Sequence, residues 1–128
     1  MNPRVLLDTD IVVDFLRGDD RAFAFIQSRQ REIVLSAITV AELYSGARDE
    51  NEADALDQFL SLFPVVPVTR PIARTAGFYQ RDWRKSHGLM LGDAVIAATA
   101  REEDARLATL NVRHFPMFSG LKPPYKKS

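Results

Sequence analysis

The sequence contains no cysteine among its 128 residues. Disulfide bonds, thiolate nucleophiles and zinc–thiolate centres are therefore excluded, because each of them needs a cysteine sulfur. A chain without disulfides has no need of an oxidising compartment, and we expect it to work in a reducing one.

Long apolar runs are also missing. No stretch is long enough to cross a bilayer, and Arg4 and Asp8 interrupt the amino-terminal segment before the apolar part of a signal peptide could form. We therefore expect a cytoplasmic protein without a membrane partner. Because its hydrophobic content of 46% and its length are ordinary for a globular protein, we expect one domain over residues 1–128, with a loosely held tail at 122–128.

An excess of one charge is the third missing feature, since 17 Lys and Arg residues balance 17 Asp and Glu residues. The balance neither requires nor excludes a nucleic-acid partner, because the positions of the charges matter more than their sum. The two signs are separated along the chain: residues 49–57 are acidic and residues 70–85 are basic. This polarity fits an acidic and a basic partner on different faces, or two solvated helix faces.

Short apolar runs alternate with longer helical patterns along the chain. We expect strands at residues 5–7, 33–35, 65–68 and 107–109, and helices at residues 11–16, 21–29, 39–47, 51–63, 71–85 and 90–103. The strands are apolar on both faces, which is typical of a parallel sheet covered by helices. The alternation predicts an α/β fold with right-handed crossovers.

Polar side chains follow these strands. Asp8 closes the first strand and Asn111 follows the fourth, while Glu42 and Asp93 stand in the opening turns of two helices. In parallel sheets ligands bind at the carboxyl ends of the strands, and we expect the three acids and the amide to meet there. Carboxylates held together repel one another unless some are protonated or a divalent cation neutralises them. Oxygen ligands alone favour Mg²⁺ or Mn²⁺ over zinc, and such an ion indicates phosphate-ester chemistry.

Each acid also has a structural explanation. Asp8 or Asp10 could cap the first helix, and Asp93 could cap the alanine-rich helix that follows it. Thr39-x-x-Glu42 has the spacing of a capping box, in which the glutamate reaches back to the cap amide. Asp8, however, stands within the strand end, and glutamate is longer than a cap requires. The acids are therefore better explained together than one at a time.

The chain resembles the PIN-domain family, and the VapC-type toxins of prokaryotic toxin–antitoxin pairs in particular, in four segments: LLDTDIVVDFLRG, LSAITVAELYSGA, MLGDAVIAATA and LATLNVRHF. The resemblance covers nearly the whole chain. It implies a three-layer α/β/α domain with a central parallel sheet, and a Mg²⁺-dependent endoribonuclease activity.

By position, the resemblance implies that the catalytic residues are Asp8, Glu42, Asp93 and Asn111. Asp8 and Asp93 are then metal ligands for Mg²⁺ or Mn²⁺, and Glu42 helps to hold the metal and positions or deprotonates the attacking water. Many relatives have an acid in place of Asn111, whose amide can orient a water or the phosphate but brings no charge. The number of metal ions, one or two, stays open.

The resemblance also implies three partners: an RNA substrate, a VapB-like antitoxin and a second copy of the chain. The antitoxin is expected near the helical hairpin at residues 39–63 and over the acidic site. Leu43, Leu56, Phe59 and Leu60 are candidates to line its groove, or to belong to the core. The basic segment at residues 70–85 is a candidate for contacts with RNA phosphates.

Two other functions fit parts of the sequence. LLDTDIVV is similar to the Asp-x-Asp motif of haloacid-dehalogenase-type phosphatases, in which Asp8 acts as the nucleophile. That alternative gives Glu42 no role and offers only Lys85 as the lysine that such enzymes need. The other alternative is a non-catalytic PIN module that binds RNA or protein, because Asn111 removes one acid from the site.

Overall fold

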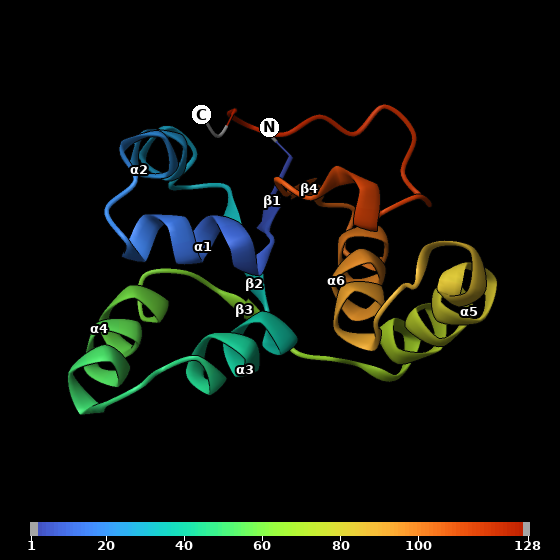
Figure 1. Ribbon diagram of the computed structural model, residues 1–128, viewed down its shortest axis with the longest axis horizontal. Coiled ribbons are helices and arrows are strands. Elements are labelled where there is room, and N and C mark those ends of the chain that lie inside the picture. Colours follow the sequence, from blue (N-terminus) through green and yellow to red (C-terminus); the bar gives the residue numbers. More distant parts are fainter. Residues whose placement is uncertain (1–2, 127–128) are drawn as a thin grey trace.

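The computed structural model describes residues 3–126 (Figure 1). The strands are β1 (Val5–Leu7), β2 (Ile33–Ser36), β3 (Val65–Val66) and β4 (Arg106–Ala108). The helices are α1 (Thr9–Leu16), α2 (Asp20–Ser28), α3 (Ala37–Ser45), α4 (Glu50–Leu60), α5 (Arg70–His87) and α6 (Leu91–Glu102), followed by a 3₁₀ helix at Val112–His114. Every expected element is present, with ends that differ by a few residues.

The four strands form one parallel sheet in the order β3-β2-β1-β4. Helices α1 to α4 lie on one side of the sheet, and α5 and α6 lie on the other (Figure 1). Successive strand residues point to opposite faces, so Leu6 and Val34 pack with α5 and α6, whereas Leu7 and Leu35 pack with the other helices. The expected α/β fold with three layers is confirmed.

The third strand departs from expectation. It is shorter than the expected residues 65–68, and it lies at the edge of the sheet. Val66 is buried there, whereas Val65 is 42% exposed. An edge strand has a neighbour on one side only, so the expectation that every strand is buried on both faces is wrong for β3.

The described part of the tail is attached to the domain through Tyr125. Its hydroxyl donates a hydrogen bond to Asp14 Oδ2 at 2.9 Å, and its ring packs against the core beneath α1. Arg21 also donates a hydrogen bond to the Lys126 carbonyl, and its guanidinium lies 6.0 Å from the centroid of the Tyr125 ring. Residues 127–128 lie outside the described part. None of the helices in residues 3–126 combines the length and the apolar character that a bilayer crossing needs.

Candidate active site

Asp8 joins β1 to α1 and is almost fully buried, with 5% of its surface exposed. One carboxylate oxygen accepts a hydrogen bond from the Thr9 amide at 2.8 Å, and the other accepts one from the Thr109 hydroxyl at 2.7 Å. Asp8 is therefore the N-cap of α1, contrary to the expectation that it stands apart from the cap. Burial raises its pKa to about 7, and the nearby carboxylates of Asp10 and Asp93 act in the same direction.

Asp10 ties the start of α1 to the segment after β4. Its Oδ2 accepts hydrogen bonds from the Leu110 amide at 3.0 Å and from the side-chain amide of Asn111 at 3.2 Å. The backbone amide of Asn111 in turn donates to the Thr109 hydroxyl at 3.0 Å. Asn111 thus lies at the acidic edge, and its side-chain amide donates to the Asp10 carboxylate. An aspartate or glutamate at position 111 would repel that carboxylate instead.

Glu42 reaches the same edge from α3. Its Oε1 accepts a hydrogen bond from the Thr9 hydroxyl at 2.6 Å, across 33 residues of sequence. Its Oε2 lies against Gly92, where an added Cβ would approach it to 2.7 Å. The capping-box explanation is wrong, because α3 begins at Ala37 and is capped by Ser36, whose hydroxyl accepts from the Ile38 amide.

Asp93 stands in the first turn of α6, one residue beyond Gly92. It is not the N-cap, since Met90 holds that position without a side-chain hydrogen bond. Burial raises the pKa of Asp93 and the Glu42 carboxylate adds to the effect, while His114 lowers it. The Nδ1 atom of His114 lies 3.4 Å from Asp93 Oδ2, a contact that the sequence did not indicate.

The acids form a row of neighbours. The charge of Asp93 raises the pKa of Asp8, and the charge of Glu42 raises the pKa of Asp93. Within residues 3–126, no three acids or histidines lie close enough together to form a complete metal cage. Magnesium rarely uses such a cage, since it keeps several waters and takes one or two carboxylates. The donor set, oxygen only with two carboxyl groups of raised pKa, fits a hydrated divalent cation.

Gly92 lies where the site leaves no room for a side chain unless Glu42 moves. The methyl group of Gly92→Ala would displace the end of the Glu42 side chain, which is flexible, so folding is expected to be little affected. The Thr9–Glu42 geometry would then be disturbed, and we expect the RNA cleavage that the family resemblance implies to fall by about tenfold or more. Cleavage rates and melting temperatures of this variant and of Gly77→Ala, where no atom lies within 4 Å of the added group, measure the effect. Equal cleavage by both variants would contradict it.

Comparison with known proteins adds a second line of observation. A family model described as "PIN domain" matches residues 5–117. Ribonuclease VapC19 of Mycobacterium tuberculosis is 46% identical over 124 residues, which cover 94% of this chain and 98% of that protein. Ribonuclease VapC10 of the same organism is 42% identical, with coverage of 94% and 92%.

Solved structures show the same fold. A toxin–antitoxin complex from Klebsiella pneumoniae contains a chain that superposes with a TM-score of 0.83 at 27% identity, covering 96% of this chain and 99% of that one. FitAcB from Neisseria gonorrhoeae superposes with a TM-score of 0.70 at 30% identity, covering 87% and 90%. In both cases the superposition covers most of each chain.

Proposed function

The chain belongs to the PIN-domain family, and from this premise we propose that it is a Mg²⁺-dependent endoribonuclease, the toxin of a VapBC-like toxin–antitoxin pair. The observation that carries the proposal is the row of carboxylates at this edge, in which Asp93 acts on the pKa of Asp8 and Glu42 acts on that of Asp93, with raised pKa values for Asp8 and Asp93. Relatives named as ribonucleases at 42% and 46% identity support the same activity.

Asp8 and Asp93 would hold the cation, with Glu42 beside them and Mn²⁺ as an alternative to Mg²⁺. A divalent cation held there would supply positive charge to polarise the scissile phosphate and to activate the attacking water. Asp8 is fixed in orientation by its two hydrogen bonds, so its charge is preorganised toward the edge.

Glu42 is the residue that handles the proton. Its Oε1 is occupied by the Thr9 hydroxyl, so Oε2 is the oxygen placed to accept a proton from the attacking water. Asn111 keeps Asp10 turned toward the segment after β4 and thereby shapes the floor on which the phosphate would lie. His114 steadies the Asp93 carboxylate from the outer side.

Incubation of purified protein with single-stranded RNA tests the proposal. Cleavage is expected with Mg²⁺ or Mn²⁺ and is expected to stop when EDTA removes the ion. Cleavage that continues in EDTA would refute the metal dependence. Intact RNA in the presence of either ion would favour a non-catalytic PIN module. The phosphatase alternative has no support, because the family model that matches residues 5–117 is that of the PIN domain.

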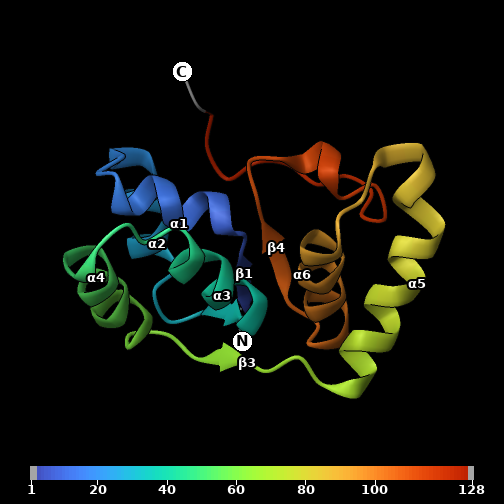
Figure 2. The same ribbon diagram turned by 60° about the horizontal axis from the view of Figure 1, so that its bottom comes forward.

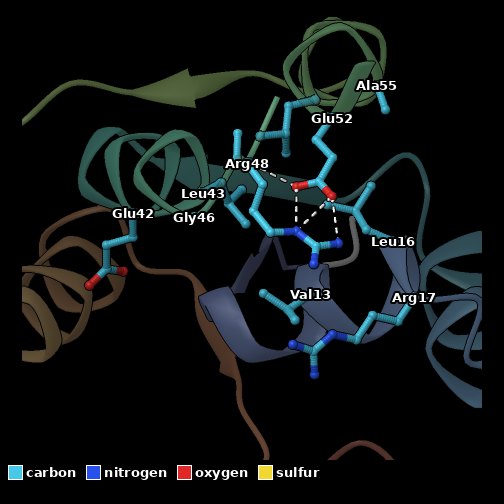
Figure 3. A pocket seen from close by; sticks show the side chains of 11 residues that line it. Val13, Leu16, Arg17, Glu42, Leu43, Gly46, Arg48, Glu52 and Ala55 are labelled. Atoms are coloured by element: carbon cyan, nitrogen blue, oxygen red, sulfur yellow. Dashed lines mark hydrogen bonds and ion pairs between the residues drawn. The ribbon is translucent and has the colours of Figure 1, made fainter. Parts of the chain in front are cut away.

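The antitoxin would bind in a groove between α1, α3 and α4. A pocket of about 680 Å³ opens there, with Val13, Leu43 and Leu56 on its apolar lining (Figure 3). Arg48 and Glu52 form an ion pair at 2.8 Å over the same pocket (Figure 3). Of the expected lining residues, Leu43 and Leu56 line this pocket and also belong to the core, Phe59 belongs to the core alone, and Leu60 packs against it.

Glu42 connects this groove to the acidic site. It lines the pocket, and its carboxylate lies at the end away from Glu52 (Figure 3). A segment with apolar side chains in the groove and a cation at its end would thus reach Glu42 and block the active site. The neighbouring structures that are toxin–antitoxin complexes support such a partner. We also propose that the chain acts as one domain and forms a homodimer.

Ala55→Arg is expected to weaken antitoxin binding and to leave RNA cleavage intact. Ala55 is exposed on α4 and lines the pocket, so a long charged side chain there fills the groove at a distance from the acids. We expect affinity to fall by about a hundredfold, the effect of losing a central anchor. Calorimetry with the cognate antitoxin measures it, with the exposed Asp54→Arg as the control. Equal affinity for the two variants would place the antitoxin elsewhere.

A further inference from the structure

Two guanidinium groups lie over one exposed aromatic ring on α5. The Cζ atoms of Arg74 and Arg81 are 4.6 Å and 4.7 Å from the centroid of the Phe78 ring, which is 39% exposed. The three residues are four and three positions apart, which places them on the same face of the helix. Cation–π contacts hold both guanidinium groups in place, so less side-chain entropy is lost when they bind a ligand.

The rest of this helix is also basic. Arg70, Arg84 and Lys85 are exposed on α5, and Asp82 is its one acid, 2.9 Å from Arg81. The opposite side of α5 packs onto α6 through buried residues such as Ile72 and Ala76. Because the whole chain has a net charge of zero, this concentration of cations is a local feature of one helix. It is complementary to a polyanion.

The basic face begins at the catalytic edge. Gly88 adopts a left-handed conformation (φ 62°) that ends α5, and α6 begins at Leu91. So short a connection makes the two helices antiparallel neighbours (Figure 2). The carboxyl end of α5 therefore lies at the same edge of the sheet as Asp93, in the first turn of α6. From there the cations extend along roughly 20 Å of helix.

We propose that the Arg74–Phe78–Arg81 face of α5 holds the RNA strand beside the site of cleavage, with the guanidinium groups on phosphates and the part of the Phe78 ring that they leave exposed against an unstacked base. This inference rests on the proposed function and adds the surface that carries the substrate. Single-stranded RNA is the favoured occupant, because an exposed aromatic ring among cations is the combination that binds unpaired nucleotides. An acidic protein would use the cations and leave the ring without a partner.

Binding of a labelled single-stranded RNA of about 16 nucleotides, in EDTA so that it stays intact, tests the proposal. Arg74→Ala and Phe78→Ala are each expected to weaken binding by about fivefold or more, and Arg74→Ala to lower the salt slope by about one. Asp82→Asn is expected to tighten binding, because it removes the one acid of this face. The matched controls are Arg31→Ala and Phe23→Ala, which alter exposed residues before β2 and on α2, with no expected effect.

Three results would overturn the inference: RNA affinity unchanged in Arg74→Ala and Phe78→Ala, weaker binding by Asp82→Asn, or a change of oligomeric state in these variants, which would assign the face to a second copy. With active enzyme, the rise in KM is expected to be larger for a long RNA than for a tetranucleotide. If the parent chain cleaves no RNA while the binding losses occur, the proposed function fails and this surface stands. If the parent cleaves and the variants bind normally, this surface alone fails.

Discussion

Asp8→Asn is expected to reduce RNA cleavage by about a thousandfold while making the metal-free protein more stable above pH 7. Asp8 is the most buried of the candidate ligands, and the substitution removes its charge while keeping its shape. In the proposed site the cation would lose a ligand, and the water that Glu42 is proposed to deprotonate would lose its position. A variant that folds and cleaves at the rate of the parent would contradict this role.

The stability effect follows from the pKa of Asp8, which burial raises from 3.8 to about 7. The native protein thus holds this proton more tightly than the unfolded chain does. The contribution of Asp8 to stability is complete below about pH 4, declines as the pH rises, and is lost above about pH 7. Asparagine has no charge to gain, so the variant should lack this decline.

Melting temperatures in EDTA at pH 5 and pH 8 measure the effect. Asp8→Asn is expected to melt above the parent at pH 8, by about 3 °C or more, and to differ less at pH 5. The exposed Asp54→Asn is the control and should follow the parent at both values. If Asp8→Asn melts below the parent at pH 8, ionised Asp8 stabilises the fold by itself and the account of its burial is wrong.

Asn111→Asp is expected to make the stability of the protein depend on a divalent cation. The side-chain amide of Asn111 donates to Asp10 at 3.2 Å, so an aspartate there places two carboxylates in contact. We expect the free energy of unfolding in EDTA to fall by about 0.5–1 kcal/mol, because this pair is exposed and solvent screens its repulsion. Added Mg²⁺ is expected to raise the melting temperature of Asn111→Asp by more than it raises that of the parent.

The control is Asn111→Ala, which loses the hydrogen bond without adding a charge. Its melting temperature should fall in EDTA and show no extra gain from Mg²⁺. Thermal unfolding of the three proteins with EDTA and with excess Mg²⁺ separates these cases. If Asn111→Asp is as stable as the parent in EDTA, the contact with Asp10 does not hold the segment after β4.

The sequence predicted the architecture because its strands are apolar and short. Val5–Leu7 has the bounds that were expected, since three buried residues are followed by acids. The start of α3 was missed because Ser36 was taken as the strand end alone, although it is also the N-cap. The capping-box spacing of Thr39 and Glu42 then placed the helix start too late. Thr39 is instead buried inside α3, so it is not available as the cap that the motif with Glu42 requires.

The candidate site was predictable in outline and not in its contacts. The carboxyl ends of parallel strands share an edge, which is enough to bring Asp8, Glu42 and Asp93 near one another. The Thr9–Glu42 hydrogen bond and the His114–Asp93 contact depend on side-chain directions across distant segments, and no periodicity in the sequence encodes these directions. The catalytic roles of Asp8, Glu42, Asp93 and Asn111 stay predictions.

We propose that Asp8 and Asp93 share one divalent cation at the edge of the sheet. A titration of the purified protein with Mn²⁺, followed by calorimetry or by the paramagnetic signal of the free ion, tests this proposal. The parent is expected to bind the ion, Asp8→Asn and Asp93→Asn are each expected to lose about tenfold or more in affinity, and the exposed Asp54→Asn is expected to bind it unchanged. Equal affinity in all four proteins would contradict it, because the ion would then lie away from these acids.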